Sequence, residues 1–376
     1  SYAFVKDGSL YIPTAFCSYG GEALDKKTPL LRSMQTLNKN ALRVLKLFGN
    51  EKVKKVFPTV GAEQEYFLID RADYEKRIDL MICGRTLYGA RPAKGQELED
   101  HYYGAIKQRV AEFMKELDEE LWKLGVYAKT KHNEVAPAQH ELACVHVSVN
   151  TASDHNQLTM ELMKTIANRH GLVCLLHEKP FAKVNGSGKH NNWSLATDTG
   201  ENLFEAGDTP RENAQFLLFL LAVIKAVDEY PELLRISVAS AGNDHRLGGN
   251  EAPPAIISIY LGEELERILD CIENGKPYSA AKKSELKIGV SVLPPIRKDS
   301  TDRNRTSPFA FTGNKFEFRM VGSAANISCP NFILNTIVAE ELRLFAEELE
   351  GAKDFDAALE TLMKRTIKEH RRVIFS

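Results

Sequence analysis

The chain has 376 residues, with 49 Lys and Arg, 51 Asp and Glu, and a formal net charge of −2. This length allows one large α/β domain or two domains of ~100–200 residues, and a composition of 43% apolar and 27% charged residues excludes an intrinsically disordered chain. The near balance of charge gives no basic field, so nucleic acid is not expected as a partner.

Membrane association and disulfide chemistry find no support in the sequence. No apolar run approaches the ~20 residues that a bilayer-spanning helix needs, and no charged-then-apolar signal segment opens the chain. None of the six cysteines forms a Cys-x-x-Cys pair. We therefore expect reduced thiols, a cytoplasmic location and no membrane partner.

The first expected elements are short strand-like pieces at 10–12 and 15–17, followed by a helix at 28–47. Thr28 suits the N-cap of this helix and Pro29 its first helical position. Apolar residues recur along it at helical spacing.

The later elements mix strands and helices without steady βα alternation, which favours an α+β fold. They are, in chain order, a strand at 60–70, a long amphipathic helix at 96–124, a strand at 142–149, helices at 155–170 and 210–228 separated by a Gly/Asn-rich stretch at 185–192, strand patterns broken by Gly and Pro at 235–260, a loop and then a strand at 303–319, and helices at 331–350 and 355–371.

The most informative segment is the predicted strand that contains Glu63 and Glu65. Residues i and i+2 of a strand face the same side, so these carboxylates project together while Ala62 and Gln64 point the other way. Two carboxylates ~6–7 Å apart repel one another unless a cation lies beside them. Taken alone, the pattern is more typical of a solvated strand face than of a cation site.

Three further segments carry polar groups at strands or turns. Their candidate residues are Glu134 and Glu141, which flank a Pro-containing turn; Asn185, Gly186, Gly188, His190, Asn192 and Ser194, in a Gly/Asn-rich stretch without Walker-loop spacing; and Lys315, Glu317 and Arg319, which alternate on one strand face. Taken alone, these patterns are more typical of rim carboxylates, an ordinary turn and a salt-bridged strand face.

Together the segments supply five glutamates, one histidine and several cations that could converge on one site. Oxygen-rich ligand sets with an occasional imidazole suit Mg²⁺ or Mn²⁺ rather than structural zinc. Divalent ions with Arg and Lys are what phosphoryl transfer from ATP needs, because they neutralise the charge on the phosphate oxygens.

In this order the segments resemble the catalytic domain of glutamine synthetase over roughly residues 55–345. The stretches 13–19 and 24–31 are similar to the type III class of that family, whose chains are much longer. Because the chain begins without Met and ends on the apolar group 373–375, we expect a fragment of a longer protein.

The resemblance implies a curved antiparallel β-sheet flanked by helices, the glutamine synthetase/guanido kinase-like fold. It implies that residues 53–376 form the catalytic domain. Residues 1–52 are expected to be a remnant of, or a connection from, an N-terminal β-rich domain, plus a helix.

The implied activity is ATP-dependent ligation of ammonia to glutamate through γ-glutamyl phosphate, with ATP and two or more Mg²⁺ or Mn²⁺ ions in each site. The expected ligands of the metal nearer the glutamate and ammonia end are Glu65, Glu134 and Glu141. Those of the metal that bridges the ATP phosphates are Glu63, His190 and Glu317.

The resemblance also implies substrate contacts. Asn185 and Gly186 match the loop that holds the amino-acid end of glutamate. Arg246 and Arg319 match arginines that hold substrate carboxylates, for which a planar guanidinium suits better than an ammonium.

Further residues match the mobile loop and the nucleotide end of the site. Glu251 matches the loop glutamate that takes a proton from ammonium and shields the acyl phosphate from water. Arg305 matches a phosphate-stabilising arginine, and Ser194 and Lys315 are expected with it near the nucleotide.

Three positions depart from the family pattern. Asn192 stands where a second histidine is common, Ala310 where a second arginine is common, and Lys315 where an arginine is usual. These departures concern nucleotide and phosphate binding more than the reaction itself.

Family members are rings with active sites shared between neighbouring subunits, so a homo-oligomer is expected. The ammonium-site aspartate of the family has no match in this chain, and we expect the isolated fragment to be impaired. Two alternatives stay open: a γ-glutamyl ligase for another amine acceptor, and a non-catalytic structural relative.

Overall fold

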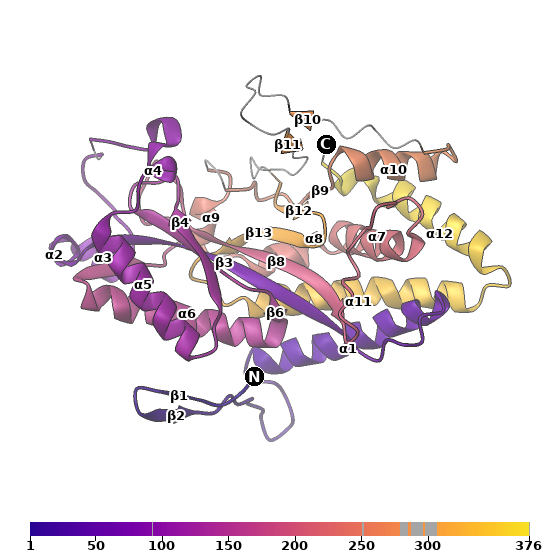
Figure 1. The fold of residues 1–376 in the computed structure, drawn as a ribbon, viewed down its shortest axis with the longest axis horizontal. Coiled ribbons are helices and arrows are strands. Elements are labelled where there is room, and N and C mark those ends of the chain that lie inside the picture. The colour runs from indigo at the N-terminus through magenta and orange to yellow at the C-terminus, as the bar shows by residue number, and fades with distance from the viewer. Residues whose placement is uncertain (92, 250–251, 279–284, 287–295, 298–306, 376) are drawn as a thin grey trace.

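The computed structural model describes residues 1–375 except 92, 250–251, 279–284, 287–295 and 298–306. Within this part of the chain the main sheet has nine strands in the order β4-β5-β3-β8-β13-β12-β9, with β6 and β7 also paired to β3 (Figure 1). Its strands are β3 (Val56–Asp70), β4 (Ala128–Asn133), β5 (Gln139–Cys144), β6 (Val147–Ser148), β7 (Leu172–Leu175), β8 (Gly188–Thr197), β9 (Ile259–Tyr260), β12 (Phe309–Phe311) and β13 (Phe316–Gly322). The expected antiparallel pairing holds throughout except between β9 and β12, which are parallel.

Long helices pack against one face of the sheet (Figure 1). The helices are α1 (Lys27–Leu47), α2 (Arg71–Tyr74), α3 (Ile78–Cys83), α4 (Asp100–Tyr103), α5 (Gln108–Lys123), α6 (Val149–Arg169), α7 (Ala214–Glu229), α8 (Pro231–Ser237), α9 (Ala241–Arg246), α10 (Glu263–Glu273), α11 (Ser328–Glu350) and α12 (Phe355–His370), with 3₁₀ turns η1 (Glu97–Glu99) and η2 (Arg371–Val373). Two small hairpins, β1 (Phe4–Lys6) with β2 (Ser9–Tyr11) and β10 (Glu285–Leu286) with β11 (Ile296–Arg297), lie outside the main sheet. No helix in the described part of the chain is long and apolar enough to cross a membrane.

Because the helices of the core cover one face of the sheet, the other face remains for a functional site. Helix α7 is apolar on all sides and buried along most of its length, as expected for a helix at the centre of a core. Side chains of β3, β8 and β13 alternate between this core and the opposite face, so Val60, Trp193 and Phe316 join the helices. Glu63 and Glu317 therefore project from the opposite face.

Buried amides hold β8 against the helices. Asn191 of β8 exchanges two hydrogen bonds with Asn331 of α11, at 3.0 and 2.8 Å. Trp193 Nε1 donates to Asn335 Oδ1 at 2.9 Å, one turn further along the same helix. Because buried polar groups need partners, these contacts oppose any slip of β8 relative to α11.

Several predictions of secondary structure are confirmed and several are wrong. The helix at 28–47, the strand at 60–70 and the two C-terminal helices match α1, β3, α11 and α12. However, α1 begins at Lys27, and the Thr28 amide donates to Asp25 Oδ1, so Thr28 is not the N-cap. The piece at 15–17 forms only an isolated bridge between Cys17 and Ala23.

Three longer predicted segments differ more from the structure. The expected helix at 96–124 is split into η1, α4 and α5, because Leu98 and Glu99, at the end of η1, are left-handed and Gly104 is extended after α4. The expected strand at 142–149 ends as β5 at Cys144, and β6 leads directly into α6. The expected strand region at 235–260 instead contains the end of α8 and all of α9, and its only described strand is β9 at its end. In these segments the local residue pattern did not determine the elements, because tertiary packing overrides local propensity.

Candidate active site

Three side chains from neighbouring strands form a cluster at the centre of the sheet. Glu63 of β3 lies opposite His190 of β8, and Glu317 lies on the next strand, β13. His190 Nδ1 is 3.1 Å from Glu63 Oε2 and 2.9 Å from Glu317 Oε1. Because one ligand atom from each lies within 4.8 Å of the others, the cluster could hold a metal ion.

A second cluster shares His190. Glu65 pairs with Glu141 across β3 and β5, and His190 Nε2 lies 3.6 Å from Glu65 Oε1. These three residues meet the same distance criterion for a metal site. Glu63 and Glu65 are i and i+2 on one strand, so they reach two adjacent clusters from the same face.

A third cluster consists of His132, Glu134 and Glu141. His132 Nε2 is 2.9 Å from Glu141 Oε1, and its Nδ1 is 3.7 Å from Glu134 Oε1. Glu134 thus gathers with Glu141, but not with Glu65, among the clusters of the described residues. Sequence reasoning missed His132, although its position two residues before Glu134 was a signal for it.

The pKa values of Glu141 and His132 depend on each other. Burial raises the pKa of Glu141, and its hydrogen bond with His132 opposes that shift. The same hydrogen bond raises the pKa of His132 to about 9. Glu141 Oε2 is buried without a hydrogen-bond partner in the described part of the chain. A buried carboxylate oxygen of this kind is suited to a cation.

Positive groups surround Glu317. Its Oε2 accepts a hydrogen bond of 2.9 Å from Arg319 Nη2. Burial acts to raise the pKa of Glu317, but the hydrogen bond and charge of His190, together with Arg319, outweigh it and hold that pKa well below its usual range. The ionised carboxylate that results, with imidazole and further carboxylates beside it, fits a hard divalent cation such as Mg²⁺ or Mn²⁺.

The glycines of the 185–188 loop are required by close contacts. The Gly188 amide donates to Glu65 Oε2 at 2.7 Å, so the loop backbone holds one of the clustered carboxylates. A Cβ at Gly188 would lie 2.5 Å from Arg246 Cζ, and a Cβ at Gly186 would lie 2.9 Å from Arg246 Cγ. Asn185, at the start of the loop, is buried.

The two arginines expected to hold substrate are buried against the sheet. Arg246 is 2% exposed, and its guanidinium donates to Asn243 Oδ1 at 3.1 Å and to the Arg319 carbonyl at 3.0 Å. Arg319 is 3% exposed and donates to the Ser307 carbonyl at 3.3 Å as well as to Glu317. The Arg246 guanidinium thus lies against the glycine loop, and the Arg319 guanidinium lies beside Glu317 of the first cluster.

The predicted nucleotide end is described in part. Ser194 Oγ donates to the Asn314 carbonyl at 2.8 Å, which anchors the turn before Lys315. Asn192, one of the departures, donates from Nδ2 to Glu63 Oε1 at 2.9 Å. The side chain that replaces a possible histidine therefore orients a clustered carboxylate. Glu251 and Arg305 lie outside the described residues.

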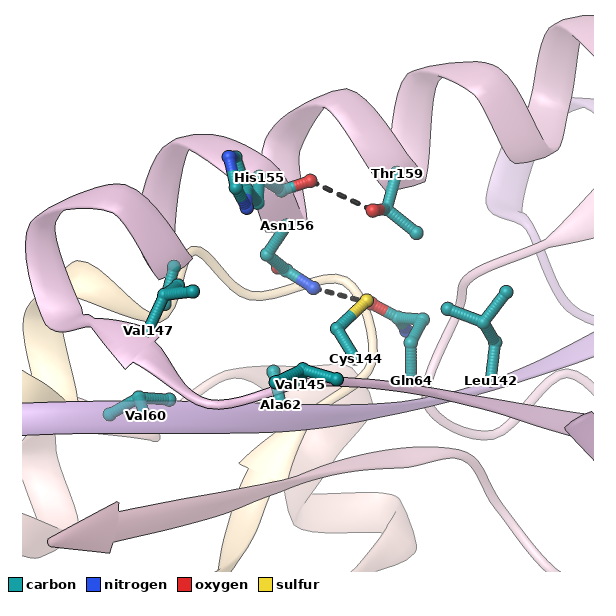
Figure 2. Close-up of a pocket in the computed structure, with 11 residues that line it drawn as sticks. Val60, Ala62, Gln64, Leu142, Cys144, Val145, Val147, His155, Asn156 and Thr159 are labelled. Carbon is teal, nitrogen blue, oxygen red and sulfur yellow. Dashed lines mark hydrogen bonds between the residues drawn. The ribbon is translucent and has the colours of Figure 1, made fainter. Parts of the chain in front are cut away.

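A polar network lies on the other face of the same strands. Gln64 faces the helices, where its Nε2 donates to the Ser323 carbonyl at 3.1 Å and its Oε1 accepts from Asn156 Nδ2 at 3.3 Å (Figure 2). Lys189 is fully buried and donates to Asn156 Oδ1 at 2.7 Å and to the Ala325 carbonyl. Burial lowers the pKa of Lys189 to about 7. Sequence reasoning placed Gln64 on this face but missed the network, because the partners Asn156, Ser323 and Ala325 come from distant parts of the chain.

Two family models match the chain. One, described as glutamine synthetase, catalytic domain, matches residues 39–257. The other, described as glutamine synthetase type III N terminal, matches residues 1–33.

Curated relatives match the chain over nearly all its length. It is 55% identical over 375 residues to type-3 glutamine synthetase of Dictyostelium discoideum, covering 99% of this chain and 51% of that protein. It is 55% identical over 381 residues to glutamine synthetase of Butyrivibrio fibrisolvens, covering 100% of this chain and 53% of that protein. The chain thus spans about half the length of these relatives.

Solved structures share the fold. Plasmodium falciparum glutamine synthetase gives a TM-score of 0.58 at 15% identity, covering 91% of this chain and 61% of that one. A structure titled apo GmaS without ligand gives a TM-score of 0.53 at 16% identity, covering 94% of this chain and 76% of that one. At these identities the likeness supports the α+β fold alone.

Proposed function

The chain belongs to the glutamine synthetase family, and from this premise we propose that the protein carrying it is a glutamate–ammonia ligase that uses ATP. In the proposed reaction a γ-carboxylate oxygen of glutamate attacks the γ-phosphorus of ATP, and ADP leaves. Ammonia then attacks the carbonyl carbon of γ-glutamyl phosphate, phosphate leaves, and glutamine forms. The observation that carries this proposal is the gathering of Glu63, Glu65, Glu141, Glu317 and His190 on adjacent strands, with Glu134 in the turn that follows β4, on the sheet face away from the core.

We assign divalent cations to these clusters. Glu63, His190 and Glu317 would hold one ion, and Glu65, Glu134 and Glu141 would supply ligands for another, with His132 beside them. When bound, Mg²⁺ or Mn²⁺ neutralises charge on the phosphate oxygens and on the oxygen that attacks. The sharing of His190 between two clusters supports two neighbouring ions rather than isolated sites.

The remaining proposed roles concern substrates. Asn185 and Gly186 hold the amino-acid end of glutamate, and Arg319 lies beside the Glu317 carboxylate, where an anionic substrate would meet it. Arg246 reaches a substrate carboxylate only after the glycine loop moves, because Gly188 covers its guanidinium. Glu251 is proposed to take a proton from ammonium.

On the nucleotide side, we keep Ser194, Lys315 and Arg305 as proposed contacts of ATP. Ser194 acts through the turn that carries Lys315, since its hydroxyl is bonded to the carbonyl of Asn314. Lys315 supplies a point charge where a guanidinium would supply two parallel hydrogen bonds.

The assembly around the site is also a proposal. The match of residues 1–33 to a type III N-terminal model supports residues 1–52 as a connection from a preceding domain to residues 53–376. We propose a cytoplasmic homo-oligomeric ring whose sites are completed by a neighbouring subunit. The type III relatives, named for glutamine synthesis, favour ammonia over another amine acceptor and over a non-catalytic role.

The test is turnover by the full-length protein. With glutamate, ammonium, ATP and Mg²⁺ or Mn²⁺, it is expected to form one glutamine for each ADP, and Glu63→Gln to abolish this. Glu75→Gln is the matched control, because Glu75 is an exposed carboxylate whose side chain contacts only Arg71 in the described part of the chain. Methylamine in place of ammonium tests the other acceptor class. ADP formation without glutamine, or full activity of Glu63→Gln, would contradict the proposal.

The isolated chain provides a further check. Purified residues 1–376 are expected to make glutamine poorly, because the neighbouring subunit's part of the site is absent. Robust ammonium-dependent turnover by this piece would show that it carries a whole active site.

A further inference from the structure

A segment that contains no predicted site residue lies beside the glycine loop and the third cluster. Residues 94–104, here called the strap, run from Lys94 through η1 and α4 to Gly104, beside the end of β4 (Figure 1). An ion pair of 2.5 Å between Lys94 and Asp100 closes the strap on itself. Most of the strap falls within the helix expected at 96–124, which the structure does not contain as one element.

Gln96 of the strap holds Asn185 by both ends of its amide. Gln96 Nε2 donates to Asn185 Oδ1 at 3.1 Å, and the Asn185 amide nitrogen donates to Gln96 Oε1 at 2.9 Å. One contact fixes the side chain and the other fixes the backbone, so the pair sets the conformation of Asn185 at two points.

The strap also contacts the carboxylate clusters. His101 Nδ1 lies 2.6 Å from the Glu134 carbonyl oxygen, and Asn133 Nδ2 donates to the Gly104 carbonyl at 3.1 Å. The rings of Tyr102 and His132 meet edge to face with centroids 5.7 Å apart. One short segment therefore touches the glycine loop at one end and the third cluster at the other.

The backbone of the strap is held in an unusual conformation. Leu98 and Glu99 have φ of 57° and 54°, in the left-handed region that non-glycine residues rarely adopt. This left-handed pair directly follows η1's first residue and precedes α4, so it turns the chain between the contact at Gln96 and the contacts at His101. The conformation is consistent with a segment whose two ends are fixed by their partners.

We propose that Gln96 is a positioning residue that orders Asn185 for the amino-acid end of glutamate, an inference that rests on the proposed function. Gln96 acts through Asn185 rather than on the reacting atoms. Removing its amide should therefore weaken glutamate binding while leaving the metal clusters and the nucleotide end in place. In the full-length enzyme, Gln96→Ala is expected to raise the KM for glutamate about tenfold, as the loss of one or two net hydrogen bonds implies.

The same variant should change kcat, the KM for ATP and the affinity for Mn²⁺ by less than about twofold, since none of these depends on Asn185. Gln96→Glu keeps the acceptor for the Asn185 amide but cannot donate to Asn185 Oδ1, so an intermediate KM is expected. Gln108→Ala is the matched control, because the Gln108 amide contacts only Glu112 on the same helix in the described part of the chain.

Two further measurements separate this inference from a general loss of structure. Hydrogen exchange at the Asn185 amide should be faster in Gln96→Ala and unchanged in Gln108→Ala. In a double-mutant cycle, Gln96→Ala should raise the KM of Asn185→Ala by a smaller factor than it raises that of the wild type, because the contact with the Asn185 side chain is already lost and only the contact with its backbone amide remains. A double variant whose KM rise is the product of the two single rises would overturn the proposed route through Asn185.

An unchanged KM for glutamate in Gln96→Ala, with an active wild-type enzyme, would overturn the inference while leaving the proposed function intact. Absence of glutamine formation by the wild-type enzyme would instead overturn the proposed function, and the role of Gln96 with it. If Gln96→Ala does not fold, the Gln96→Glu variant, whose side chain keeps the same shape, decides the question by the same KM comparison.

Discussion

The substitution Gly188→Ala tests the packing of the glycine loop against Arg246. The added Cβ would lie 2.5 Å from Arg246 Cζ, whereas ordinary contacts begin at about 3.4 Å. The guanidinium would therefore have to retreat by ~1 Å, or β8 would have to move by a similar amount. Either shift matters, because the Gly188 amide also holds Glu65 Oε2 at 2.7 Å.

The expected loss of stability follows from the contacts that each of these shifts would break. Overpacking of a well-packed site costs ~1–3 kcal/mol, and loss of a hydrogen bond from a charged donor such as Arg246 costs ~1.5–3 kcal/mol. A destabilisation of ~2.5–6 kcal/mol is thus expected in the free energy of unfolding. Because a 1 Å misplacement in an active site can cost ~10²-fold in rate, kcat/KM for glutamate should fall by about that factor.

The assay compares Gly188→Ala with Gly351→Ala in the full-length enzyme. A Cβ at Gly351 meets no atom nearer than 3.8 Å, and this glycine has φ of −84°, so an alanine fits there. Melting temperature and steady-state kinetics are measured for both. If Gly188→Ala matched Gly351→Ala in both measurements, the close approach of the loop to Arg246 would be wrong.

Three other predictions concern single carboxylates. Glu317→Ala should lower turnover by about three orders of magnitude or more, because a metal position loses an anionic ligand beside Arg319; unchanged steady-state kinetics would refute the assignment. Burial raises the pKa of Glu341 to about 7 from 4.5, so the folded state keeps a proton that the unfolded state has lost, and stability should fall as pH rises from 4.5 to 7. Urea unfolding at pH 5 and pH 8 should show that Glu341→Gln reduces this fall, and equal falls with and without the substitution would contradict it. Glu251→Ala should preserve Mn²⁺ affinity in calorimetry and impair the use of ammonia, and loss of metal binding would show that Glu251 is misplaced.

The alternation of β3 was predictable because it depends only on strand geometry. The period of two puts Glu63 and Glu65 on one face and Gln64 on the other, and the structure confirms this. The same rule separates Glu317 and Arg319 from the phenylalanines beside them. Wherever a residue lies inside a regular strand, its face follows from the sequence.

The grouping of carboxylates from different strands was less predictable. Glu134 lies beyond the end of β4, and its place depends on the turn between β4 and β5 rather than on a repeating pattern. That turn and the pairing of the two strands bring it to Glu141 and add His132. The turn between these two consecutive strands sets their register, and the residue pattern of each strand alone does not specify it.

The strap shows a second limit of prediction from the sequence. Residues 96–124 carry helical periodicity, but Gly104 and the left-handed pair Leu98 and Glu99 interrupt it. These interruptions allow Gln96 to reach Asn185, which lies 89 positions away in the chain. A contact of this range is set by the packed fold and not by local propensity.

The central claim is that the acidic clusters hold divalent cations, and calorimetric titration of Mn²⁺ into the full-length protein tests it most directly. We expect at least two ions for each chain in the wild type, one fewer in Glu63→Gln, and unchanged binding in the surface control Glu75→Gln. Absence of Mn²⁺ binding by the wild type, or binding that Glu63→Gln leaves intact, would show that the acidic clusters are not cation sites.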